Sequence, residues 1–161
     1  MAIRIQAKRD LSRVEFIGEA DDAIDHAHKE CDYEEYLKTG DQSHLRFKPD
    51  CSPTRFVCNF EMKGKDSERV KNAILSGRDL DGKATIAYGS MTYQLVKHTL
   101  KAIEYDPKEP LETQIVLRKD DRQNVHDETV AILDRYGVVS GIWALYANLV
   151  MTPARAETKN S

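Results

Sequence analysis

The chain of 161 residues is long enough for one domain of ordinary size, which buries about two-thirds of the surface that its unfolded form exposes. Its 24 basic and 27 acidic residues leave a formal net charge of −3, so it lacks the basic excess that is typical of nucleic-acid-binding domains. No apolar run approaches the ~20 residues that span a bilayer, and Met1 to Ile5 alternate instead of forming a secretory signal, so we expect a protein of the cytoplasm.

Three segments alternate apolar and polar residues and therefore predict strands. Residues 11–17 place Val14 and Phe16 on one side, residues 54–62 alternate most strictly, and residues 113–118 form a shorter run. The inward-facing side chains that we expect in the second segment are Phe56, Cys58, Phe60 and Met62.

Four segments have apolar residues at helical spacing. Residues 20–38 are acidic, and the following Thr39-Gly40-Asp41 is typical of a helix C-terminal cap and turn. Residues 66–77 predict a short helix, and residues 90–105 predict one whose buried stripe contains Leu95, Val96, Thr99, Leu100 and Ile103. Residues 124–151 predict the longest helix, with Asn124 as its N-cap.

Together these elements predict an α+β fold. We expect a single domain over residues 1–152, in which a small antiparallel sheet of N-terminal and central strands packs against three to four helices, including a long C-terminal helix. The polar residues 153–161 are expected to form a disordered tail.

His26, His28 and Cys31 lie within six residues and are the candidate metal ligands, with Cys51 and Cys58 further along. Zinc requires about four tetrahedral ligands, and two histidines two residues apart on a helix point about 200° from each other. We therefore expect free thiols and no metal site, while a zinc-dependent enzyme built on these three residues stays the alternative.

The remaining chemical motifs are weak. Asp79 to Gly82 is typical of a turn, since an EF-hand register would put Gly77 and Tyr88 at positions that need ligands. Ser90 is better explained as a helix cap than as a nucleophile, and His98 as a surface residue. His126, Asp127 and Glu128 have no nucleophile beside them, so we expect no catalytic residue. The sequence has no phosphate-binding loop either, and we expect no cofactor.

The last predicted helix contains two glycines four residues apart, Gly137 and Gly141, which would allow another backbone to approach closely. Each costs ~1 kcal/mol of helix propensity relative to alanine. The approaching partner is either the preceding helix of the same chain or another subunit, and a third possibility is that the glycines break the helix in two. With Tyr136, Trp143 and Tyr146 as anchors, these residues form a candidate interface.

Residues 36–49 read YLKTGDQSHLRFKP, and residues 53–56 read PTRF. This combination resembles small proteins that tailed bacteriophages encode among their head and tail morphogenesis genes, such as tail assembly chaperones. In that group an acidic N-terminal segment leads into a P-T-x-F strand and then into a helical half. The Y-G-L-x-G phrase of the group is matched only loosely by residues 87–91, which read AYGSM, and the N-terminal strand region is longer here.

The resemblance implies a non-enzymatic structural or tail-assembly protein that acts through protein–protein contacts. Its partners would be a tape measure protein, a tail-tube component or a second copy of the chain, and its location the host cytoplasm or the virion. No nucleic-acid or membrane partner is implied. A domain that binds a ligand or a host protein in a pocket with Tyr88, Tyr93 and Trp143 is a further alternative.

Overall fold

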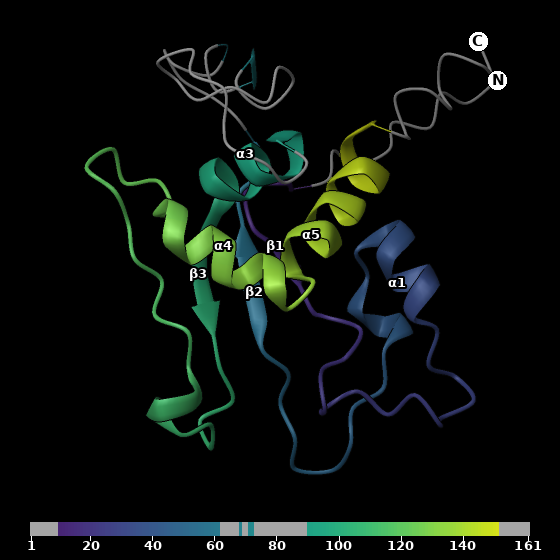
Figure 1. Cartoon of the computed structure of the whole chain (residues 1–161). Helices are drawn as coiled ribbons and strands as arrows, with labels where there is room; N and C mark the ends of the chain where they lie inside the picture. The colour runs from purple at the N-terminus through teal and green to yellow at the C-terminus, as the bar shows by residue number, and fades with distance from the viewer. Residues whose placement is uncertain (1–9, 62–67, 69–70, 73–89, 152–161) are drawn as a thin grey trace, which may run out of the picture.

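The computed structural model describes residues 10–61, 68, 71–72 and 90–151, and it confirms the α+β class. A three-stranded antiparallel sheet contains β1 (Val14–Phe16), β2 (Arg55–Cys58) and β3 (Leu100–Glu104), in that spatial order. Figure 1 shows helices α4 and α5 lying across this sheet, with α3 at one end and α1 beside α5.

The two faces of the sheet differ in polarity, as the alternating sequence requires. Phe16 pairs with Phe56 in the register of β1 and β2, and both rings are buried toward the helices. The opposite face has ion pairs: Arg13 contacts Glu104 at 2.7 Å, and neighbouring arginine and glutamate side chains extend this network. The strands predicted around Val14 and Phe56 are therefore confirmed.

Three helices cover the apolar face, namely α3 (Ser90–Thr99), α4 (Asp127–Arg135) and α5 (Val138–Tyr146). Helix α5 contacts α3, α4 and β1, so it is the central element of the main core. Its buried residues are Val138, Val139, Ile142 and Leu145.

A second, smaller core lies under helix α1 (Tyr33–Thr39) and the 3-10 turn η1 (Gln42–His44). Tyr36 is fully buried there, and its hydroxyl donates to the Glu15 carbonyl at 2.8 Å and accepts from the Ile17 amide at 3.0 Å. Gly40 ends α1 with a φ of 70°, which confirms the predicted cap.

The helix predicted over residues 20–38 is wrong in its first part. Asp32 caps α1 through the Glu35 amide, so the helix begins only at Tyr33, and residues 18–31 form successive turns. The Asp21 carboxylate accepts hydrogen bonds from the amides of Ala23 and Thr54. Aspartate side chains compete in this way for backbone amides that a helix would use.

The helix predicted over residues 90–105 is also wrong in its second part. Helix α3 ends at Thr99, and the chain continues directly into β3, where Ile103 pairs with Phe56. The predicted stripe is nevertheless buried from Leu95 to Leu100. An apolar run of this kind fits either a helix or a strand, and pairing with β2 decides between them.

The single helix predicted over residues 124–151 is divided at Gly137, whose φ of 75° belongs to the left-handed region. The N-cap of α4 is His126, not Asn124, and α5 continues into the π-helical turn η3 (Ala147–Met151). One of the alternatives for the two glycines was that they break the helix. The structure shows this break at Gly137.

The strand predicted over residues 113–118 is a 3-10 turn, η2 (Leu111–Thr113), followed by chain outside the sheet. The expected alternation persists, because Ile115 and Leu117 pack on the core while Val116 is exposed. His98, expected on the surface, is only 7 % exposed.

Several predictions concern residues outside the described part of the chain. They are the N-terminal alternation through Ile5, the inward-facing Met62, the helix over residues 66–77, the Asp79 to Gly82 turn and the tail over residues 153–161.

Candidate functional site: an aromatic groove

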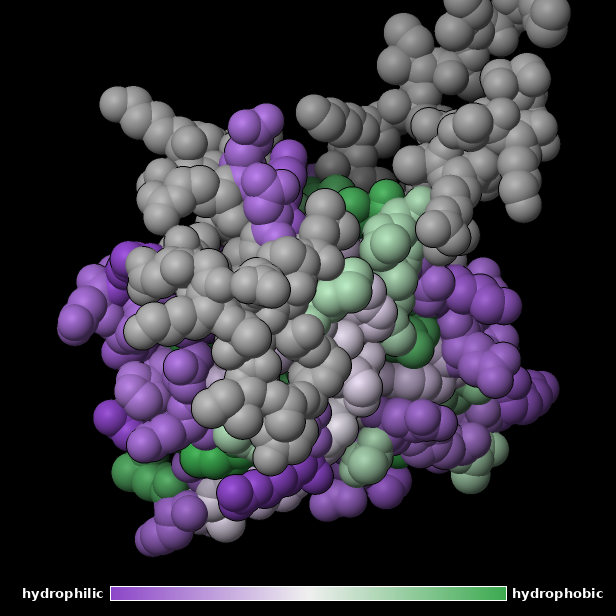
Figure 2. Space-filling view, turned by 45° about the horizontal axis from the view of Figure 1, so that its top comes forward, coloured by the Kyte–Doolittle hydropathy of each residue, from purple (hydrophilic) through white to green (hydrophobic). Residues whose placement is uncertain are grey.

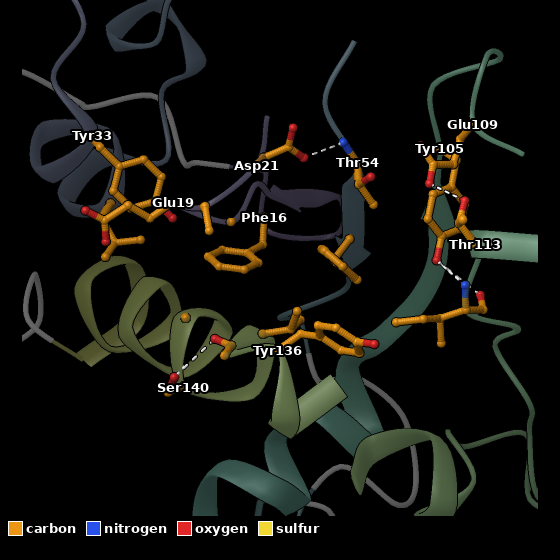
Figure 3. Close-up of a pocket in the computed structure, with 18 residues that line it drawn as sticks. Phe16, Glu19, Asp21, Tyr33, Thr54, Tyr105, Glu109, Thr113, Tyr136 and Ser140 are labelled. Carbon is orange, nitrogen blue, oxygen red and sulfur yellow. Dashed lines mark hydrogen bonds between the residues drawn. The ribbon is translucent and has the colours of Figure 1, made fainter. Parts of the chain in front are cut away.

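A hollow of about 610 Å³ lies between the sheet, the turns after β1 and the junction of α4 with α5. The aromatic side chains that line it, Phe16, Tyr33, Phe56, Tyr105 and Tyr136, come from segments far apart in the sequence. We call this hollow the aromatic groove. In Figure 3, Tyr33 and Glu19 lie at one end, Tyr105 and Glu109 at the other, and Phe16 between them.

The floor of the groove is held by a close approach of α5 to β1. A Cβ atom at Gly141 would lie 2.2 Å from Cζ of Phe16, which is far inside van der Waals contact. Only a glycine leaves room for the Phe16 ring, whose centroid is 6.1 Å from that of Phe56. The close approach is therefore intramolecular, and it is made to a strand and not to α3.

The tyrosine walls are fixed by hydrogen bonds to the backbone. The Tyr33 hydroxyl donates to the Ile17 carbonyl at 2.7 Å, and the Tyr105 hydroxyl accepts from the Ile115 amide at 2.6 Å. Burial raises the pKa of both phenols, so both stay protonated at neutral pH. These hydrogen bonds to the backbone fix the orientation of the two rings.

The break between α4 and α5 places Tyr136 at the rim. Gly137 accepts the left-handed conformation at low cost, and this turns α5 away from the axis of α4. Tyr136 precedes the break and is 72 % exposed, although its ring lines the groove. Ser140 also lines it, and its hydroxyl donates to the Gly137 carbonyl.

The structure separates the predicted interface residues into two groups. Tyr136, Gly137 and Gly141 line the aromatic groove. Trp143 and Tyr146 lie further along α5, with ring centroids 5.8 Å apart, and pack against the main core. Trp143 and Tyr146 do not line the groove. The prediction that these five residues contact another protein stays a prediction.

The candidate metal ligands are not brought together. The His26 ring nitrogen Nε2 contacts the Glu19 carbonyl oxygen at 2.7 Å, and His28 Nδ1 accepts from the Glu30 amide. Across residues 10–61, 68, 71–72 and 90–151, no three His, Cys, Asp or Glu side chains lie in a geometry that could hold a metal ion. All three cysteines are free thiols, as expected, and that of Cys58 is buried.

A buried polar pair lies in α3, outside the groove. The Gln94 side-chain oxygen is 3.2 Å from His98 Nε2, while Gln94 Nε2 and His98 Nδ1 have no hydrogen-bond partner within the described structure. Burial lowers the pKa of His98, with the nearby Asn124 side chain and Asp120 carboxylate opposing the shift. The pair is thus kept uncharged inside the core.

Tyr93 and Trp143, proposed for a ligand pocket, are not among the residues that line the groove, and Tyr88 lies outside the described residues. The Tyr93 hydroxyl donates to the Asp127 carbonyl at 3.0 Å and so connects α3 to α4. The structure therefore assigns Tyr93 a packing role.

Sequence reasoning identified Phe16 and Phe56 as core residues but not as the floor of a groove, and it missed Tyr33, Tyr105 and Glu109. A spacing argument could not find them because each comes from a different segment. The concentration of acidic residues after β1 was the one available signal.

None of the helices in the described part of the chain is both long and apolar enough to cross a lipid bilayer. The chain matches no protein-family model, no curated protein and no solved structure at a significant level.

Proposed function

We propose that this chain is a non-enzymatic assembly protein of a tailed bacteriophage. It acts in the host cytoplasm by binding other morphogenesis proteins, such as a tape measure protein or tail-tube component, or a second copy of itself. The observation that carries the proposal is the aromatic groove, a hollow of about 610 Å³ at the junction of several segments. Most of the side chains that line it are aromatic or aliphatic. The phage assignment comes from the sequence resemblance, and the binding role from this groove.

The chemistry of the walls favours binding over catalysis. The hydroxyls of Tyr33, Tyr105 and Ser140 are each hydrogen-bonded to the backbone. The Asp21 carboxylate accepts two amide hydrogen bonds, one through each oxygen. General acid–base or nucleophilic chemistry needs groups that are free to exchange protons with a substrate, and these groups are used to shape the groove.

Exposed apolar side chains at the rim supply anchors for a partner. Tyr136 is 72 % exposed and lines the groove, and Leu111 is 82 % exposed in the η2 turn, between the lining residues Glu109 and Thr113. On the face that Figure 2 shows, the coloured residues at the periphery are mostly hydrophilic, and the apolar ones lie in separate patches. Aromatic side chains beside a concavity are common centres of binding energy in protein interfaces.

The test is photocrosslinking from the rim, with benzoylphenylalanine in place of Tyr136 and, as a matched control, in place of the exposed Asp121, which does not line the groove. In cells that express the neighbouring morphogenesis genes, the Tyr136 position is expected to give a discrete crosslinked product, identified by mass spectrometry as one of their proteins or a second copy. Equal labelling from both positions would contradict the proposal, as would a strict monomer in sedimentation velocity with no product.

A further inference from the structure

The net charge of the chain is close to zero, but its acidic and basic residues are unevenly distributed along the sequence. Residues 15–35 contain nine of the 27 acidic residues and one basic residue, Lys29, whereas the rest of the chain contains 18 acidic and 23 basic residues. This segment includes β1, the turns that follow it and the start of α1. It lines one side of the aromatic groove and carries a formal charge of −8 there, whereas the rest of the chain has a formal charge of +5.

The groove itself is acidic. Glu19, Asp21 and Glu109 line it, and its lining contains neither lysine nor arginine. None of the three carboxylates takes part in an ion pair with another described residue. In Figure 3, Glu19 and Glu109 lie at opposite ends of the groove. The apolar floor is thus bounded at both ends by a carboxylate that the described residues leave without a cation.

We propose that the aromatic groove binds an extended segment of a partner protein in which apolar side chains lie between basic residues. The proposal rests on the proposed function and specifies the partner's chemistry. The apolar side chains would fill the hollow above the buried Phe16 and Phe56 and pack against the exposed Tyr136 ring. A lysine or arginine at each end would reach Glu19 or Glu109. The Tyr33 ring next to Glu19 offers an additional cation–π contact.

The negative charge of the groove disfavours other classes of ligand. An acidic segment would place like charges next to three carboxylates, and a nucleic acid or an anionic membrane would bring phosphates to the same face. A wholly apolar segment would leave the carboxylates partly desolvated without a counter-charge, which carries an energetic cost. A segment with basic residues at both ends of an apolar centre matches both the apolar floor and the carboxylates at the two ends of the groove.

The experiment is selection of a displayed random decapeptide library on the immobilised full-length chain, with counter-selection on the Gly18→Trp variant. Gly18 lines the groove, has no left-handed φ, and would have no atom within 4 Å of a new Cβ. The position therefore accepts a side chain without backbone strain, and we expect a tryptophan there to obstruct the groove. Enriched peptides are expected to contain two basic residues that flank apolar ones. Their affinity, from fluorescence anisotropy, should fall at least about tenfold on Gly18→Trp.

The charge contribution is tested on the best peptide with Glu19→Gln and Glu109→Gln. Each is expected to weaken binding by up to about fivefold, and more at low salt, because exposed ion pairs are modest and screened. Glu34→Gln is the matched control, since it removes the same charge at an exposed position that does not line the groove. It should leave affinity unchanged. These polar substitutions keep the test valid if Gly18→Trp fails to fold.

The outcomes separate the two proposals. Groove-dependent peptides that lack basic residues, or that bind Glu19→Gln and wild type equally well, would refute this inference and leave the proposed protein-binding function intact. If no peptide distinguishes wild type from folded Gly18→Trp, the groove is not a peptide-binding surface and both proposals fail.

Discussion

The contact between Gly141 and Phe16 gives the sharpest prediction about stability. In an unconstrained helix, Gly141→Ala would stabilise the chain by ~1 kcal/mol through helix propensity. Here the new Cβ would lie 2.2, 2.8 and 3.0 Å from three atoms of the Phe16 ring, so the ring must move by more than an ångström. Phe16 is 2 % exposed and packed against Phe56, which leaves it little space.

Overpacking of this kind costs ~1–3 kcal/mol, which exceeds the gain in propensity. We therefore expect Gly141→Ala to lower the free energy of unfolding by ~1 kcal/mol or more, measured by urea denaturation with Trp143 fluorescence. Phe16→Leu removes the ring atoms that the Cβ would meet, so in that background Gly141→Ala should be neutral or stabilising. The two substitutions should consequently be coupled in a double-mutant cycle.

Ser140→Ala is the matched control on the same helix, because Ser140 is exposed; it should change stability by no more than ~0.5 kcal/mol. The reasoning would be refuted if Gly141→Ala were at least as stable as wild type, or if its effect were the same with Phe16 and with leucine at position 16. Either result would mean that α5 does not approach β1 as closely as the structure shows.

Three further predictions test the rest of the core. Tyr36→Phe should lower the free energy of unfolding by ~2 kcal/mol in urea denaturation, because it leaves the buried Ile17 amide and the partly buried Glu15 carbonyl without their shared partner. A thiol reagent should modify the exposed Cys51 rapidly and Cys58 only on unfolding, since burial raises the pKa of Cys58 to about 12; rapid modification of Cys58 in the native chain would contradict its burial. Burial lowers the pKa of His98, so the imidazole binds a proton more readily in the unfolded chain than in the folded one. The contribution of His98 to stability is therefore complete above about pH 6.5, the pKa in the unfolded chain, and is lost as the pH falls toward the lower folded pKa. Urea midpoints should fall between pH 7.5 and 5.5 in wild type and fall less in His98→Gln.

The amino-acid sequence by itself determined the features that depend on neighbouring residues. The alternation around Val14 and Phe56 predicts strands because side chains in an extended chain point to opposite faces, and this holds wherever the strand pairs. Gly40 predicts a helix end because glycine adopts the left-handed conformation with little strain. The inward direction of Ile115 and Leu117 followed from the same alternation, although no ladder forms there.

Only the tertiary structure decided where apolar runs change from helix to strand and which polar segments form turns. The change at Thr99 depends on pairing with β2, and the turns before α1 depend on Asp21 bonding an amide 33 residues away. The groove is the clearest case. Its floor, walls and carboxylates come from separate segments, and their proximity depends on the absence of a Cβ at Gly141, whose neighbour Phe16 is 125 positions earlier in the chain. Local patterns do not contain such distances, because they arise only when packing brings the segments together.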